Sequence, residues 1–111
     1  MSAKDDAIAT GNTALNNLYA LMNAALAAHD ATTQARVQSS IDDLTDKLDQ
    51  LNKAAIAADD ARLGPLNTQL NQVTTSATAA MADLSTTITV LNDVAAAAKL
   101  IDGILGIVAG L

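Results

Sequence analysis

The chain has 111 residues, no cysteine and a formal net charge of -6, with twelve acidic and six basic residues. This length allows one domain with a small hydrophobic core. The acidity disfavours binding to nucleic acids and to anionic membrane surfaces, because both repel a negative protein. The absence of cysteine excludes disulfides and thiolate metal sites. The first residues lack the apolar run of a signal peptide, so we expect a cytoplasmic protein, with leaderless secretion or a removed signal peptide as the alternatives.

The first third of the chain predicts a helix over about residues 4–29. Its larger apolar residues recur at helical spacing on one side, with Tyr19 beside them: Ile8, Leu15, Leu18, Met22 and Leu26. We interpret Tyr19 as a core aromatic with its hydroxyl at the rim, the alternative being an exposed anchor for a partner. From His29 to Thr33 large apolar residues are absent, and Asp30 can cap a new helix, so we predict a break there.

A second helix is predicted over about residues 33–63. Its apolar residues alternate by three and four positions, which puts them on one face: Val37, Ile41, Leu44, Leu48 and Leu51. Asp43 with Lys47 and Asp49 with Lys53 form acid-before-base pairs four residues apart. Gly64 and Pro65 then indicate the end of one helix, with Arg62 in its last turn, and the start of the next.

The same helix carries the densest acidic group of the chain, Asp42, Asp43, Asp46 and Asp49. A divalent cation needs several oxygens that converge on one point, whereas carboxylates along a straight helix diverge. We therefore interpret this group as a solvated face, and we expect no metal ligands.

A third helix is predicted over about residues 65–97, followed by an apolar extension over 98–111 that contains three of the five glycines. The apolar spacing continues unbroken from Leu70 to Val108, which indicates one helical register. The stretch 63–82 contains no charged residue, so we expect it to face other helices on more than one side.

The extension is the candidate contact site of the chain. Its large apolar residues can complete the bundle core or a dimer seam, enter a lipid surface, or await another protein. The residues concerned are Leu100, Ile101, Ile104, Leu105, Ile107, Val108 and Leu111. The segment is too short and too interrupted by charge to span a bilayer by itself.

These patterns predict an all-α fold, an antiparallel bundle of three helices in a single domain over residues 1–111. The alternative is a long two-helix hairpin that dimerises into a four-helix bundle, with one helix over about residues 4–62. The single histidine, His29, has no nucleophile nearby in the sequence, and no glycine-rich phosphate loop occurs, so we expect no catalytic, cofactor or small-molecule site. We predict a non-enzymatic interaction or structural module that self-associates or binds a protein. The alternative is a membrane-active protein that uses its C-terminal tail.

Overall fold

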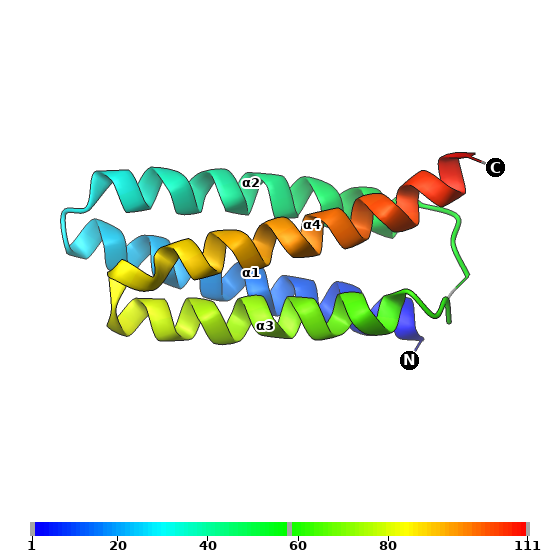
Figure 1. Cartoon of the computed structure of the whole chain (residues 1–111), viewed down its shortest axis with the longest axis horizontal. Helices are drawn as coiled ribbons and strands as arrows, with labels where there is room; N and C mark the ends of the chain where they lie inside the picture. The colour runs from blue at the N-terminus through cyan, green and yellow to red at the C-terminus, as the bar shows by residue number, and fades with distance from the viewer. Residues whose placement is uncertain (1, 58, 111) are drawn as a thin grey trace.

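The chain folds into an elongated bundle of α-helices. A computed structural model describes residues 2–57 and 59–110, and the surroundings of side chains as far as Gly106. These residues form α1 (Ala3–Ala27), α2 (Ala31–Lys53), α3 (Leu63–Ala82), the 3-10 turn η1 (Leu84–Thr86) and α4 (Thr87–Gly110). Figure 1 shows the four long helices lying side by side in a molecule of 46 × 24 × 18 Å. The predicted all-α bundle is confirmed, and the predicted number of three helices is wrong.

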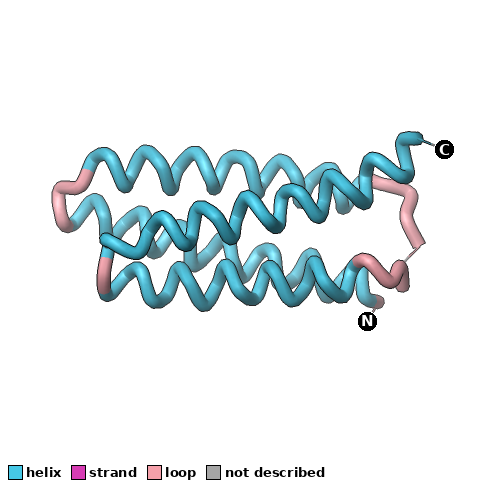
Figure 2. The backbone as a smooth tube through the Cα atoms, viewed as in Figure 1, coloured by secondary structure: helices cyan, strands magenta, loops and turns pink. Residues whose placement is uncertain are grey.

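The bundle consists of two helical hairpins packed on each other. α1 and α2 are antiparallel, as are α3 and α4, with the connecting turns at the ends of the molecule (Figure 2). α1 packs against α2 and α3, and α4 packs against the same two helices. α1 therefore lies diagonally opposite α4. The apolar face of each hairpin is covered by the other hairpin of the same chain.

The break predicted after the first helix is confirmed in the structure. The carboxylate of Asp30 accepts a hydrogen bond from the backbone N–H of Thr33 and so caps α2. His29, in the turn, has a φ of 57°, a left-handed conformation that ends α1 sharply. Because the break is real, the alternative of one helix over residues 4–62 is wrong, and so is the dimer of long hairpins built on it.

A second break divides the predicted third helix. α3 ends at Ala82, and Asp83 accepts a hydrogen bond from the backbone N–H of Ser85 at the start of η1. The helix predicted over 65–97 is therefore two helices, and residues 98–110 belong to the second half of α4 rather than to a separate extension. The spacing of Leu84, Thr87 and Leu91 suits a continuous helix, which is why periodicity alone did not reveal the break.

The connection between the hairpins is longer than the sequence suggested. α2 ends at Lys53, about three helical turns before the predicted end at residue 63, and a loop crosses the end of the bundle (Figure 1). Arg62 lies at the N-terminal boundary of α3 rather than in the last turn of α2, and Pro65 lies in the first turn of α3, where its missing N–H is tolerated. Gly64 has no positive φ and serves no C-cap.

All four helices contribute to one core. The apolar spacing predicted its members well in α2, but in α1 the buried face consists of Ala7, Gly11, Ala14, Leu18, Leu21 and Ala25. Of the large residues predicted for that face, Ile8, Leu15 and Met22 are only partly buried and Leu26 is exposed. The five residues from Val37 to Leu51 that define the face of α2 are all buried. The other large buried side chains are Leu18, Leu21, Leu63, Leu66, Leu70, Val73, Val90, Val94, Ile101 and Ile104. Small residues let α1 approach its neighbours closely, as at Gly11, which lies against Leu48 of α2.

Candidate interaction sites

The structure separates the seven predicted contact residues into different environments. Ile101 and Ile104 are 0% and 1% exposed and belong to the core of the bundle. Leu105 is partly buried against that core, whereas Leu100 is 37% exposed. The side chains of Ile107 and Val108, and Leu111 altogether, lie outside the described residues. Among the described side chains of this set, Leu100 on the outer side of α4 is therefore the most exposed.

Two glycines give the outer side of α4 an unusually bare surface. Gly103 and Gly106 are exposed, and a Cβ added at either position would meet no atom within 4 Å. Neither glycine is needed for close packing within the chain or for a left-handed backbone. Glycine inside a helix nevertheless costs about 1 kcal/mol relative to alanine. Packing among the described residues thus gives no reason for these two glycines.

A shallow apolar groove lies beside this surface, between the start of α3 and the second half of α4. Its volume is about 240 Å³, and its lining comprises Arg62, Pro65, Lys99, Leu100, Gly103 and Ile104. Arg62 is tied to Asp60, whose carboxylate accepts hydrogen bonds from Nε at 2.8 Å and from Nη2 at 2.5 Å. These bonds, and the one from the backbone N–H of Arg62, lower the pKa of Asp60 to about 2.

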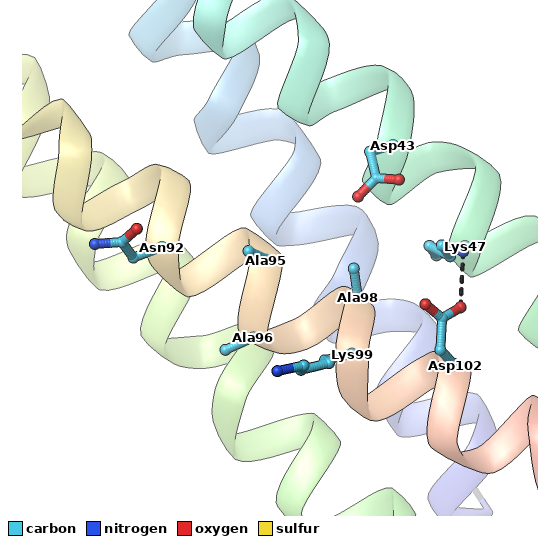
Figure 3. A pocket seen from close by; sticks show the side chains of 8 residues that line it. All are labelled: Asp43, Lys47, Asn92, Ala95, Ala96, Ala98, Lys99 and Asp102. Carbon is cyan, nitrogen blue, oxygen red and sulfur yellow. Dashed lines mark ion pairs between the residues drawn. The ribbon is translucent and has the colours of Figure 1, made fainter.

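A larger and more polar groove runs between α2 and α4. It has a volume of about 530 Å³ and is floored by alanines of α4, with charged side chains at its margin (Figure 3). Lys47 and Asp102 form an ion pair of 2.7 Å across it. The hydrogen bond to Asp102 raises the pKa of Lys47. The pairing predicted between Lys47 and Asp43 is thus replaced by one between helices, whereas the predicted pair of Asp49 and Lys53 is present at 2.9 Å.

The acidic group of α2 is spread around the helix surface. Asp42, Asp43, Asp46 and Asp49 are all exposed. Within the described part of the chain, no three His, Cys, Asp or Glu side chains gather as a metal site would require. Asp42 accepts a hydrogen bond from Gln38, and Asp46 accepts one from Gln50. His29 is exposed in the turn between α1 and α2.

A third surface lies on the outer side of the α1–α2 hairpin, and the sequence analysis gave it only as an alternative for Tyr19. Tyr19 is 45% exposed and Leu26 is 55% exposed, so Tyr19 does not lie in the core as first interpreted. The position of these two residues in the sequence indicated their exposure. Tyr19 directly follows the buried Leu18, and Leu26 directly follows the buried Ala25. A helix of 3.6 residues per turn places such neighbours 100° apart, at the edge of the buried face.

Comparisons with protein-family models, with curated proteins and with solved structures find no match to this chain. Among the helices of the described residues, none combines the length and the apolar character that crossing a bilayer requires.

Proposed function

We propose that this protein is a non-enzymatic helical interaction module that associates with a second copy of itself through the outer side of α4. The repeated apolar spacing does not by itself favour self-association, because the two hairpins of one chain cover each other's apolar faces. The proposal rests on the exposed surface formed by Leu100, Gly103 and Gly106.

The shape and apolar character of this surface favour contact with a second copy over exposure to water. The bare backbone at Gly103 and Gly106 lets another helix approach closely, and Leu100 at the edge supplies an apolar side chain to cover it. In an antiparallel, two-fold arrangement centred on Gly103, Leu100 of each copy would lie over Gly106 of the other. Each copy then contributes the same patch, as an isologous interface requires.

Sedimentation equilibrium between micromolar and millimolar concentration tests the proposal. We expect the native chain to show a concentration-dependent dimer, and the double variant Gly103→Gln/Gly106→Gln to remain a monomer. Glutamine is the better helix former and has room at both positions, so loss of the dimer would not reflect unfolding. Thr89→Gln, at another exposed position of α4, is the control and should dimerise like the native chain. A native chain that stays monomeric over this range contradicts the proposal.

Membrane contact through the same end of α4 is the second candidate function. Residues 103–111 contain no charge, and α4 continues as a helix to Gly110. Co-sedimentation with neutral and with anionic vesicles separates this function from self-association. If lipid is the target, the native chain will pellet and Leu100→Asp will not. If both chains remain in the supernatant with both kinds of vesicle, this candidate is excluded.

A further inference from the structure

A second apolar stripe runs along α1 beside the buried one. It consists of Ile8, Leu15, Tyr19, Met22 and Leu26, spaced by seven, four, three and four residues. Ile8, Leu15 and Met22 are partly buried against the core, whereas Tyr19 and Leu26 are 45% and 55% exposed. We call these five residues the outer stripe of α1. Its spacing is that of a helix face that packs on another helix.

The outer stripe faces the α2 side of α1. Ile8, Asn12 and Leu15 line a hollow of about 240 Å³ together with residues of α2, including Thr45 and Asp49. The opposite flank of α1 faces α3, since Thr78 of α3 donates a hydrogen bond to the side-chain oxygen of Asn17 at 3.3 Å. The outer stripe therefore runs along the α2 side of α1. Ile8 and Leu15 line the hollow, and Tyr19 and Leu26 continue the same stripe beyond it. We call this hollow and its continuation along the stripe the groove between α1 and α2.

The other wall of this groove is polar and acidic. Asp49 and Thr45 line the hollow, where Asp49 is paired with the exposed Lys53 at 2.9 Å. Asp42 lies seven residues before Asp49, on the same side of α2. Asp42 accepts a hydrogen bond from the neutral amide of Gln38, which leaves the charge of its carboxylate in place. Asp43 points the other way, into the groove between α2 and α4 (Figure 3).

We propose that the groove between α1 and α2 binds a cationic amphipathic helix of a protein partner. An apolar wall beside an acidic wall complements a helix with one apolar face bordered by Lys or Arg. The outer stripe extends from Ile8 to Leu26, about 27 Å at 1.5 Å per residue, which matches a partner helix of about five turns. A second copy of this acidic chain fits less well, because its own charge of -6 would oppose docking on the acidic wall.

A designed peptide tests the groove in the intact protein. The probe is a fluorescently labelled 18-residue amphipathic helix made only of leucine and lysine, titrated by anisotropy at low and at physiological salt. A peptide with glutamate in place of every lysine, and a scrambled leucine–lysine peptide, serve as controls. We expect the helical leucine–lysine peptide alone to bind, with an affinity that falls as salt rises.

Matched variants locate the binding. Tyr19→Ser/Leu26→Ser should raise the Kd of the peptide at least tenfold. Ile88→Ser, at a residue 57% exposed on α4, should change the Kd less than twofold. Asp42→Asn should weaken binding several-fold and Asp43→Asn less than twofold, because the two neighbours lie on different sides of α2. All five substituted residues are exposed, so the four variants should retain the fold, as far-ultraviolet circular dichroism will show.

Three outcomes would overturn the proposal. One is unchanged affinity in Tyr19→Ser/Leu26→Ser, and another is equal loss in Asp42→Asn and Asp43→Asn. The third is a peptide-free dimer that Tyr19→Ser/Leu26→Ser dissociates, since a second copy would then occupy the groove. The proposal does not depend on self-association through α4, because the glycine variants of α4 leave this groove unchanged.

Discussion

At the scale of single residues, Gly11 shows how closely α1 approaches α2. A Cβ at Gly11 would lie 2.6 Å from Cδ1 and 2.7 Å from Cδ2 of Leu48, which is itself only 5% exposed. Overpacking a core costs about 1–3 kcal/mol, and replacing glycine within a helix returns about 1 kcal/mol. We therefore predict that Gly11→Ala lowers the free energy of unfolding by about 1 kcal/mol, measured by urea titration.

Two comparisons isolate the contact between Gly11 and Leu48. Gly103→Ala, at a position with no atom near the new methyl group, should instead raise stability by about 1 kcal/mol. Leu48→Ala alone should cost about 2–5 kcal/mol. The double variant Gly11→Ala/Leu48→Ala should cost less than the two single changes together, because the new methyl group then has space. Strict additivity would show that the two residues do not compete for volume.

Asp60 makes stability depend on acid pH. Its hydrogen bonds from Arg62 lower its pKa from 3.8 to about 2. Above pH 4 the carboxylate is ionised in both folded and unfolded chains, so its stabilising contribution is fully present. As the pH falls from about 4 to 2, the unfolded chain binds the proton first, and this contribution is lost.

We predict that Asp60→Asn flattens part of this pH dependence. The variant should be less stable than the native chain at pH 7, and the difference should shrink toward pH 2, as followed by urea unfolding at each pH. The caps Asp30 and Asp83 also have lowered pKa values, from hydrogen bonds with Thr33 and Ser85, so some acid sensitivity should persist in the variant. A constant difference between the two proteins from pH 7 to pH 2 would refute the role assigned to Asp60.

At the scale of helices, the sequence predicted the buried face of α2 well, but it predicted the face of α1 and several helix boundaries poorly. The spacing of three and four identified the buried side of α2 because a buried face must recur with the helical period. Asp30 revealed the first break because it adjoins a stretch without large apolar residues. Asp83 is followed by Leu84, which fits the helical spacing of the apolar residues. The spacing therefore gave no sign that Asp83 caps a new helical segment. The uncharged stretch 63–82 in fact coincides with α3, and the charges that flank it, Arg62 and Asp83, were the available signal.

The candidate sites were less predictable than the helices because exposure depends on which helices become neighbours. The sequence showed that residues 98–111 are rich in aliphatic side chains. The helical spacing that begins at Leu70 includes Ile101 and passes over Leu100, yet both residues remained candidates for contact with a partner. Only the packing of α4 against α2 and α3 buries the first and leaves the second 37% exposed. For the same reason Lys47 pairs with Asp102 in space rather than with Asp43 four residues before it.

The α3–α4 hairpin is held by a polar contact that can be tested by itself. Ser76 of α3 is only 7% exposed, and its hydroxyl donates a hydrogen bond to the carboxylate of Asp93 in α4. Gln69 also donates to the backbone oxygen of Asp93, at 3.0 Å. We predict that Ser76→Ala lowers the free energy of unfolding by about 1–3 kcal/mol, the range for hydrogen bonds to charged groups. Ser39→Ala, at an exposed position of α2, should change it by less than about 0.5 kcal/mol.

At the scale of the whole molecule, the bundle is closed by pairing two hairpins of one chain. The long loop over residues 54–62 carries the chain from α2 to α3 across the end of the bundle. Lys4 of α1 donates a hydrogen bond to the backbone oxygen of Ala54 at 2.9 Å and so ties this loop to the first hairpin. The second half of α4 consequently has two roles. Its inner side packs against the rest of the bundle, and its outer side presents Leu100, Gly103 and Gly106 to the surroundings.

This double role predicts that the end of α4 cannot be removed without loss of the bundle. A chain ending at Ala97 lacks Ile101 and Ile104, both essentially buried, and the ion pair of Lys47 with Asp102. Loss of the two isoleucines alone costs about 4–10 kcal/mol, which is comparable with the whole stability of a domain of this size. The shortened chain should therefore show no cooperative urea transition, whereas Leu100→Ala in the full chain should unfold cooperatively at nearly the native midpoint. A cooperative transition of the shortened chain at the native urea midpoint would mean that α4 beyond Ala97 serves contacts outside the molecule alone.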